Sequence, residues 1–415
     1  MTVTEMAGVV RVRSHQSNSN NSRHFSRLIK SCCPNPDAPS HSFSPFNPIV
    51  VVKPKFPTIR KTSICCLPDD ILYDILSRVP LSSLPSISAV CRRWARLVDA
   101  DTFSLLRRMH ARLHPTLFVF SLVNTTSFST LRLFVDDSWN VSRNDVVPFR
   151  LPSDVHADIS HARVTAVGRK VFIVSRFNCL CFDPWTGMVK PRSEPVWPRK
   201  RFAIAAVNGR VYVAGGSPHA SEVEEFNPDT NEWRVVSDAP RRRYGCVGVG
   251  VESVFYIIGG LKIGGASDTR AAEARAFASS MDLYDVASRG WLKTRSVPGG
   301  GCVVAACGAH GHVYVLASHA VELSFWRFNA TRNGSSGSGT FGEWCRMRPP
   351  PMPAQVRVGG GVKYSSVGVE EKVVLIQVNK IQANVFIFDC VTQEWSSAPN
   401  LPHFVQRVAT ICVDC

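Results

Sequence analysis

The sequence predicts an all-β propeller of six four-stranded blades, preceded by a small all-α domain. Five short apolar runs, typical of buried strands, begin 40, 44, 58 and 60 residues apart between Val171 and Val373. In three of the repeats an aromatic residue stands seven positions before a tryptophan, with turn residues between them. Repeats of about 45 residues with several strands each are typical of a β-propeller. Before residue 115 the apolar periodicity is helical, which indicates a separate domain.

Composition excludes several other classes of protein. The 415 residues are 45% apolar, which suffices for two or three domains with their own cores. The sequence has no apolar run of about 18 residues that could span a membrane, and no apolar segment near its start that would mark a secretory signal. The net charge is +16, but no basic helix or aromatic-interleaved basic motif indicates nucleic-acid binding. We therefore expect neither a membrane nor nucleic acid as the main partner.

Residues 1–60 are predicted to be a disordered basic tail. They are rich in serine and proline and hold eight Lys or Arg against two acidic residues. Such a segment buries too little apolar surface to offset the entropy of ordering. The same Ser-rich, acid-poor composition is also typical of an organelle transit peptide. Import into an organelle therefore stays open as an alternative to a plain flexible tail.

Residues 65–112 are predicted to form the helical domain. The run from Pro68 to Asp70 is typical of a helix start. An apolar stripe with helical spacing follows, and Pro80 ends the helix. A second helix is expected over 83–97 and a short third one over 102–113. So few residues form only a small core, and such a bundle usually needs a partner surface.

Residues 115–415 are predicted to form the propeller. Five repeats begin near residues 162, 202, 244, 302 and 355. Residues 115–160 hold most of a sixth repeat but lack its first strand, and the apolar run 408–413 has no other repeat to join. We expect this C-terminal strand to complete the sixth blade and close the ring. Closure removes the two exposed sheet edges that would otherwise invite aggregation.

Few patterns in the chain indicate catalysis or a cofactor. No phosphate-binding loop, dinucleotide-binding glycine motif, H-E-x-x-H zinc motif or nucleophile elbow is present in the sequence. The 14 cysteines form no disulfide-like framework, and Cys412 and Cys415 lack two further ligands for zinc. His310 and His312 align with the turn before a strand, so turn geometry explains them better than a metal ion does. We predict no metal, no cofactor and no intrinsic enzyme activity.

Two resemblances connect these patterns to known families. Residues 67–110, with their L-P-D-D-I-L and V-C-R-R-W runs, resemble an F-box. The strand repeats resemble kelch repeats in their double glycines and paired aromatic residues: Gly215, Gly216, Phe226, Trp233, Gly259, Gly260, Tyr284, Trp291, Phe388 and Trp395. The kelch pattern is degenerate, because the other repeats lack the double glycine and Val189 stands where one tryptophan is expected. The chain is thus similar to the F-box/kelch-repeat proteins, a class abundant in plants.

The resemblance implies a receptor rather than a catalyst. F-box proteins are substrate-recognition subunits of SCF-type ubiquitin ligases, in which the F-box binds a Skp-type adaptor that connects to cullin and RING subunits. The second domain binds the target protein. The adaptor-binding residues would be the apolar ones of the motif: Leu67, Pro68, Ile71, Ile75, Leu76, Val79, Pro80, Val90, Cys91 and Trp94. Such a receptor acts in the nucleus or the cytoplasm. The alternatives are a kelch binding scaffold without a ligase role and a kelch-propeller enzyme.

Two basic triplets suggest where a target binds. They precede Phe202 and Tyr244, which we expect to open the first strands of two blades. In a propeller of this type the connections between blades share one face with the loops between second and third strands, so both triplets would lie on one rim. Guanidinium groups there would select acidic or phosphorylated segments, whereas the alternative is a solvated basic surface with no partner. The predicted substrate-binding residues are Arg199, Arg201, Arg241, Arg242 and Arg243.

Overall fold

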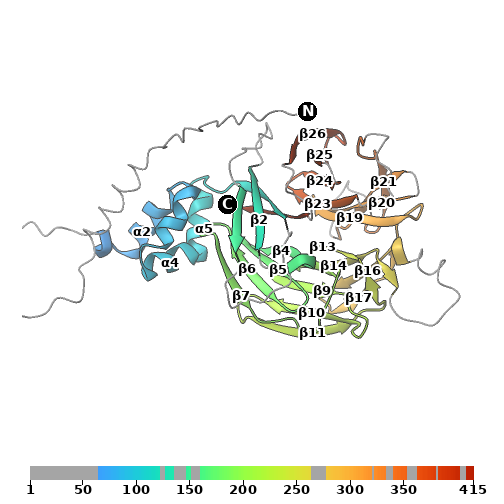
Figure 1. Ribbon diagram of the computed structural model, residues 1–415, viewed down its shortest axis with the longest axis horizontal. Coiled ribbons are helices and arrows are strands. Elements are labelled where there is room, and N and C mark those ends of the chain that lie inside the picture. Colours follow the sequence, from blue (N-terminus) through green and yellow to red (C-terminus); the bar gives the residue numbers. More distant parts are fainter. Residues whose placement is uncertain are drawn as a thin grey trace, which may run out of the picture. The chain divides into compact units, whose positions relative to one another are not determined.

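The computed structural model describes residues 64–121, 127–134, 146–150, 159–262, 277–319, 322–332, 340–352, 362–379, 382–401 and 408–415. These residues form two compact units, which divide between His110 and Ala111 and are described separately (Figure 1). The first unit is helical and the second consists of β-sheets. The predicted tail lies outside the described residues. None of the described helices is long and apolar enough to cross a membrane.

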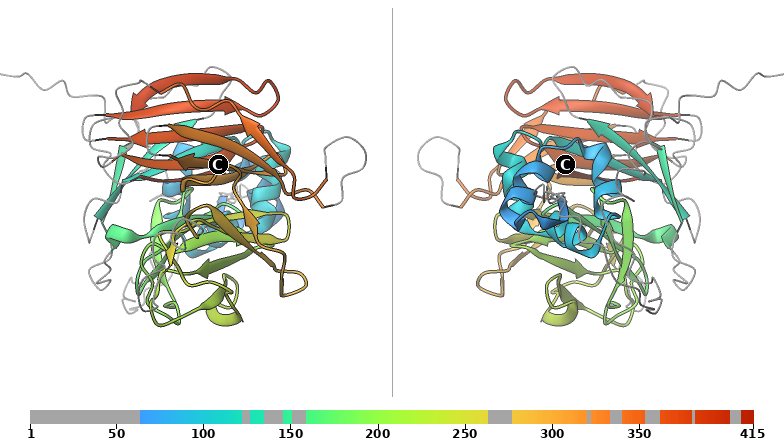
Figure 2. Two further views of the ribbon diagram at one scale, coloured as in Figure 1. Left: turned by 90° about the vertical axis from the view of Figure 1, so that its right-hand side faces the viewer. Right: turned by 90° about the vertical axis from the view of Figure 1, so that its left-hand side faces the viewer.

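The described part of the helical unit contains η1 (Ile64–Cys66), α2 (Asp69–Ser77), η2 (Leu81–Ser83), α3 (Leu84–Ser88), α4 (Arg92–Asp99) and α5 (Asp101–Met109). Figure 2 shows these helices as one bundle, coloured blue to cyan. The single helix predicted over 83–97 is wrong, because the chain divides there into α3 and α4. Val90 donates its amide hydrogen to the Ile87 carbonyl in a tight final turn, and Cys91 is extended, with φ −161° and ψ 165°. The Cys91 carbonyl then accepts the first hydrogen bond of α4.

A small apolar core holds these helices together. Its buried members come from every α-helix: Leu72, Leu76, Leu84, Ile87, Trp94, Leu97, Val98 and Phe103. Arg107 of α5 is also buried, and its guanidinium donates hydrogen bonds to the carbonyls of Ser77 and Val79 at 3.2 and 2.8 Å. Carbonyls at a helix C-terminus have no partner within the helix. Arg107 therefore satisfies the end of α2 and connects it to α5.

The second unit is a six-bladed propeller of antiparallel sheets, as predicted. The first blade holds β27 (Val408–Asp414), β1 (Pro115–Ser121), β2 (Ser127–Phe134) and β3 (Val146–Arg150). The second blade holds β4 (Arg163–Val167), β5 (Lys170–Val174), β6 (Cys179–Asp183) and β7 (Met188–Arg192). The third blade holds β8 (Ala203–Val207), β9 (Arg210–Ala214), β10 (Glu222–Asn227) and β11 (Glu232–Asp238).

The remaining three blades complete the ring. The fourth blade holds β13 (Val247–Val251), β14 (Val254–Ile258), β16 (Ser280–Asp285), β17 (Gly290–Trp291) and β18 (Arg295–Ser296). The fifth holds β19 (Cys302–Ala309), β20 (His312–Ser318), β21 (Leu323–Asn329) and β22 (Trp344–Met347). The sixth holds β23 (Lys363–Val369), β24 (Lys372–Val378), β25 (Ala383–Asp389) and β26 (Trp395–Leu401). A short ladder of β12 (Arg243–Tyr244) with β15 (Leu261–Lys262), and the turn η3 (Ile159–His161), complete the described elements. In Figure 2 the red sixth blade lies across the ring from the green third blade.

The C-terminal strand closes the ring, as the sequence predicts. β27 pairs antiparallel with β1 along its whole length, from Pro115 opposite Asp414 to Ser121 opposite Val408. His114 extends the ladder, since its amide and carbonyl both bond to Cys415, at 2.9 and 3.0 Å. The first and last strands of the unit thus share one sheet. The start predicted near 355 for the sixth blade lies outside the described residues, and its first described strand begins at Lys363.

The paired aromatic residues are cross-strand neighbours. Phe226 lies opposite Trp233 with ring centroids 5.0 Å apart, and the pairs at 284 and 291 and at 388 and 395 have the same arrangement, both at 5.1 Å. In the second blade Val189 lies opposite Phe182, in the tryptophan position. The fifth blade has a pair that sequence reasoning missed, Phe328 opposite Trp344 at 5.0 Å. An insertion in the turn hides it, because the two residues are not seven apart.

The innermost strands of the six blades surround the central channel of the propeller. At one level of this channel, neighbouring inner strands contact each other. Each blade contributes one inner-strand residue there: Ala166, Ala206, Gly250, Gly308, Gly368 and Cys412. On the second strands these pair with Val171, Val211, Phe255, Val313, Val373 and Leu117, respectively. We call these six residues the collar. A Cβ added at Gly368 would lie 2.0 Å from the Gly308 carbonyl oxygen, and one added at Gly250 would lie 2.3 Å from that of Ala206. Backbone therefore packs on backbone, which only very small residues allow.

The collar predicts a strong size limit at Gly368. Replacing Gly368 with Ala is expected to lower the free energy of unfolding of the propeller by about 1–3 kcal/mol or more, because the methyl group overlaps backbone that cannot rotate away. The measurement is urea unfolding followed by tryptophan fluorescence. Gly290→Ala is the matched control, since the nearest atom to its added Cβ would be a serine Oγ at 3.4 Å. Equal stability of the two variants would contradict the size limit.

Candidate functional site

The predicted adaptor-binding residues divide into three groups by exposure. Pro68, Ile71, Ile75 and Pro80 are exposed; Leu67, Val79, Val90 and Cys91 are partly buried; Leu76 and Trp94 are buried. The last two build the core of the helical unit and present no surface to a partner, which corrects the expectation for them. Sequence spacing could not separate them from the exposed residues, because a helix with an apolar outer face carries apolar residues on both sides.

The two faces of α2 differ sharply in exposure. Leu72 and Leu76 are 0% and 3% exposed, whereas Ile71 and Ile75 are 45% and 40% exposed. Residues four apart lie on one side of a helix. Together with the exposed Pro68 just before the helix, the two isoleucines form an apolar outer face. A contiguous exposed apolar surface of this kind is typical of an interaction site.

Sequence reasoning missed two exposed apolar residues on α5. Leu105 and Met109 are 58% and 71% exposed and lie four residues apart. Phe103 and Arg107, also four apart, are the buried residues of the same helix. Leu105 and Met109 were visible in the sequence as an apolar pair at helical spacing, and they add exposed apolar side chains on a second helix of the unit.

A hydrogen-bonded arginine fixes the start of α2. Arg93 of α4 donates from Nε to the Asp69 carboxylate at 2.7 Å and from Nη2 to the Leu67 carbonyl at 2.6 Å. Leu67 and Asp69 flank Pro68, so α4 holds the leading end of the outer face in place.

In the propeller, Arg199 is not available to a partner, which corrects the prediction for this residue. Its side chain is 2% exposed, and its partner Glu224 on β10 is fully buried. Nε and Nη2 donate to one carboxylate oxygen of Glu224 at 2.8 and 2.7 Å, and the Val196 amide donates to the other oxygen. Nη1 donates to the Gly215 carbonyl at 2.8 Å. A buried charge requires such a complete set of partners, so Arg199 is structural.

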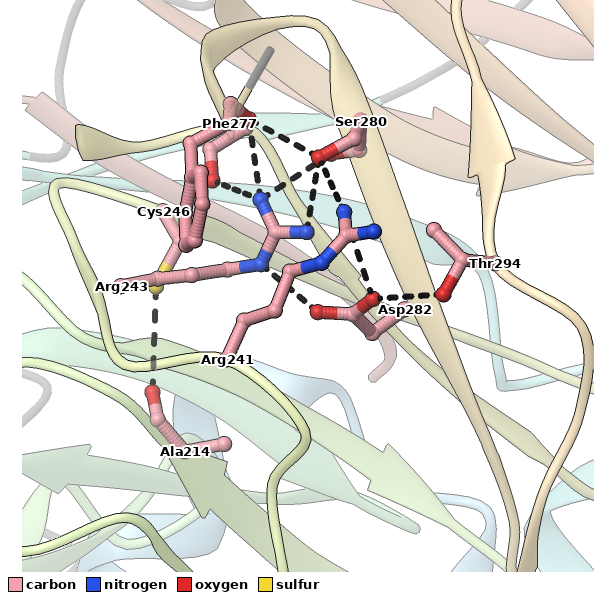
Figure 3. A network of polar contacts seen from close by, with 9 residues as sticks. Ala214, Arg241, Arg243, Cys246, Phe277, Ser280, Asp282 and Thr294 are labelled. Carbon is pink, nitrogen blue, oxygen red and sulfur yellow. Dashed lines mark hydrogen bonds and ion pairs between the residues drawn. The ribbon is translucent and has the colours of Figure 1, made fainter. Parts of the chain in front are cut away.

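Arg243 occupies the corresponding place in the fourth blade (Figure 3). Its side chain is fully buried; Nε donates to Asp282 of β16 at 2.8 Å, and Nη1 donates to the Gly259 carbonyl at 2.8 Å. Nη2 donates to the Ser280 hydroxyl at 2.8 Å, and the Thr294 hydroxyl donates to the second oxygen of Asp282 at 3.1 Å. Arg243 is therefore also structural, and it too is removed from the predicted substrate-binding set.

These two ion pairs correct the alignment of the third and fourth blades. Each buried arginine lies 16 residues before the first glycine of a double glycine and donates to its carbonyl. A Cβ on the second glycine would touch Phe202 in the third blade and Cys246 in the fourth. Phe202 thus corresponds to Cys246. The alignment of Phe202 with Tyr244 that the sequence predicts is wrong. The repeated spacing of 16 was the signal that would have given the correct alignment.

Three of the predicted cations remain accessible. Arg201 and Arg242 are exposed, and the side chain of Arg241 is 32% exposed. The Arg201 guanidinium lies over the ring of Tyr244 at 5.8 Å. Arg241 is partly engaged, because it donates to the Ser280 hydroxyl at 2.9 Å and lies 3.8 Å from Asp282 (Figure 3).

Exposed apolar residues accompany these cations. Phe177, between β5 and β6, is 49% exposed, with the Arg176 guanidinium 4.8 Å from its ring centroid. Val196, between β7 and β8, and Leu261, between β14 and β16, are each 50% exposed. By the strand order, the connections between blades and the loops between second and third strands share the face at which the inner strands begin. We call this face the loop face; its mixture of cations and apolar side chains suits an acidic segment with apolar residues.

Within the described ranges, no group of three or more His, Cys, Asp or Glu side chains could hold a metal ion. His310 has φ +47° and lies in the turn between β19 and β20, where the sequence placed it. His312 is buried at the start of β20, and burial lowers its pKa to about 4.

Comparison with known proteins identifies both units. A family model described as "F-box domain" matches residues 64–105, and one described as "Kelch motif" matches residues 198–240, which contain β8 to β11. The chain is 47% identical to F-box/kelch-repeat protein At5g26960 of Arabidopsis thaliana, over 95% of this chain and 98% of that protein. The chain belongs to the F-box/kelch-repeat family. It is also 25% identical to F-box/kelch-repeat protein At1g67480 of the same plant, over 47% of this chain and 54% of that protein.

The buried ion pairs make a stability prediction for the kelch blades. Asp282→Asn leaves the buried Arg243 without its counter-charge, and we expect it to lower the free energy of unfolding by about 3–5 kcal/mol. Urea unfolding monitored by tryptophan fluorescence measures the loss. Arg242→Gln, at an exposed neighbour, is the control and should change stability by less than about 0.5 kcal/mol. A near-neutral Asp282→Asn would show that Arg243 is not held as described.

Proposed function

We propose that this F-box/kelch-repeat protein is the substrate-recognition subunit of an SCF-type ubiquitin ligase. Its F-box binds a Skp-type adaptor, and through it cullin and RING subunits, while the propeller binds the target protein. The observation that carries the proposal is the exposed apolar face of α2, with Ile71 and Ile75 at 45% and 40% exposure inside a matched F-box domain.

The proposed role needs no chemistry from this chain. A receptor that holds both the adaptor and the target converts their encounter into an intramolecular one, which raises the effective concentration of the target at the ligase. The protein is then a non-catalytic subunit without a cofactor. It acts where cullin complexes act, in the nucleus or the cytoplasm, unless residues 1–60 direct it into an organelle.

The physics of the F-box supports an adaptor. The helical unit has only eight buried apolar side chains in its core among the residues described, yet it leaves Ile71, Ile75, Leu105 and Met109 substantially exposed. Covering an aliphatic side chain of this size contributes about 1.5–3 kcal/mol when burial is complete. An adaptor that covers the outer face of α2 would therefore gain affinity and stabilise the unit at once.

For the target, the loop face of the propeller is the proposed site. Of the cations predicted there, Arg201, Arg241 and Arg242 are accessible and Arg199 and Arg243 are not. Accessible guanidinium groups bind carboxylates and phosphates in bidentate fashion. We propose an acidic or phosphorylated segment as the recognised feature of the target.

The adaptor proposal is tested by co-purification of the full chain with a Skp-type adaptor. Ile71→Ser with Ile75→Ser is expected to weaken binding at least about tenfold, because it removes the apolar outer face without entering the core. Leu67→Ala with Pro68→Ala should act in the same direction. Val391→Ser, at a propeller residue that is 63% exposed, is the matched control and should bind normally. Wild-type binding by the double isoleucine variant, with unchanged thermal stability, would defeat the proposal.

The target proposal is tested by reversing charge on the loop face. Arg201→Glu with Arg242→Glu should reduce recovery of ubiquitinated targets in cells several-fold and leave adaptor binding unchanged, and recovery from wild type should fall as salt rises. Arg289→Glu is the control, since this exposed arginine lies in a turn between third and fourth strands, on the other face. If the control and the double variant lose targets equally, the loop face is not the binding site.

A further inference from the structure

A cavity of about 380 Å³ occupies the centre of the propeller. Residues of all six inner strands line it, so it is the central channel of the ring. Most of these residues are small, including the collar glycines. The volume lies near the lower end of the range seen for small-molecule sites, which suits a small ligand better than a folded segment.

One side of this channel is polar. Arg163 is the first residue of β4, Thr410 lies on β27, and Ser365 lies on β23; all three line the cavity. The three strands belong to consecutive blades, and the hydroxyls of Ser365 and Thr410 are hydrogen-bonded to each other at 2.9 Å across the blade boundary.

Arg163 and Ser365 lie at the same level of the channel. Arg163 pairs with Val174 on the second strand of its blade, and Ser365 pairs with Ile376 on the second strand of its own. In their own blades, Val174 and Ile376 each stand just before the position that corresponds to the double glycine of the third and fourth blades. Arg163 and Ser365 therefore extend from one level of the channel near the loop face, and the Arg163 guanidinium lies near Arg201 and Cys246.

Arg163, which is partly exposed, differs from the buried Arg199 and Arg243 in having no counter-charge. Arg199 and Arg243 each reach a carboxylate on the third strand of their blade. Among the described residues, by contrast, the side chain of Arg163 makes no ion pair or hydrogen bond. Burial lowers its pKa, the nearby Cys246 thiol opposes this shift, and the positive charge of Arg201 adds to it. A guanidinium in this position is short of both negative charge and acceptors.

We propose that the central channel binds a small anion bearing a carboxylate or phosphate group, with Arg163 as its counter-ion. Such a group supplies the charge that Arg163 lacks and accepts up to two parallel hydrogen bonds from its guanidinium. The hydroxyls of Ser365 and Thr410 add polar groups to the lining of the same channel. The site is separate from the α2 face, so it stands or falls independently of adaptor binding.

The first test measures anion binding by the full chain without adaptor or target. The dialysed protein is titrated with sodium phosphate and, separately, with sodium citrate, against sodium chloride at equal ionic strength. We expect a saturable rise in melting temperature with at least one of the two anions, and a matching dissociation constant from calorimetry. Arg163→Gln should weaken binding of that anion at least tenfold. Arg289→Gln, at an exposed arginine on the other face of the propeller, should leave it unchanged.

A second readout needs no anion. In chloride alone, Arg163→Gln should melt at a higher temperature than wild type, because it removes a partly desolvated charge that has no counter-charge and that Arg201 repels. If it melts lower, Arg163 has a structural partner and the proposal fails. The proposal would also be overturned if neither anion bound to the protein. Equal binding by wild type and Arg163→Gln would overturn it too, because cations outside the channel would then be responsible. Binding that is lost in Arg242→Gln but not in Arg163→Gln would assign the anion to the loop face and overturn the channel site.

Discussion

The fold of the propeller depends on one long-range pairing, that of β27 with β1. This pairing joins residues almost 300 positions apart in the chain and places the last strand on the inside of the first blade. Without it, two sheet edges would be open and the inner surface of the first blade would be missing. With it, the number of blades is fixed, and the inner strands must share a channel narrow enough that several of them touch backbone to backbone at the collar. The small residues of the collar are a consequence of closure, which is why they recur at one level.

The buried arginine–carboxylate pairs attach the third and fourth blades to the segments that enter them. In the third and fourth blades the arginine reaches from that segment to the carboxylate on the third strand and to the carbonyl of the first glycine of the double glycine. Both positions of the double glycine need glycine, because the backbone φ there is positive and the neighbouring atoms leave no room for a Cβ. These pairs take two cations away from the loop face. The positive charge available to a partner is therefore smaller than the sequence suggests and differently placed.

The helical unit and the propeller present surfaces of different chemistry. The outer face of α2 is apolar, and the core of the helical unit is small. A partner that covers this face would therefore add to the stability of the unit. The loop face combines cations with scattered apolar residues, which favours electrostatic steering and selection of a charged segment. The channel is a third environment, lined mostly by small residues, in which Arg163 is a partly desolvated guanidinium without a counter-charge.

The sequence by itself determined the fold class, the number of blades, the closing strand and the F-box, because each rests on a local period or motif repeated along the chain. It also located the aromatic pairs wherever the turn has its standard length, and missed Phe328 with Trp344 where an insertion changes that length. Only the tertiary structure decided which arginines are accessible. Arg199, Arg201 and Arg243 look alike in sequence, but whether a carboxylate lies within reach depends on how the third strand packs, and for Arg199 and Arg243 that partner is 25 and 39 residues away. The same reason separates Leu76 from Ile75 and sets Arg163 apart: burial and counter-charge are properties of neighbours in space, which no local pattern records.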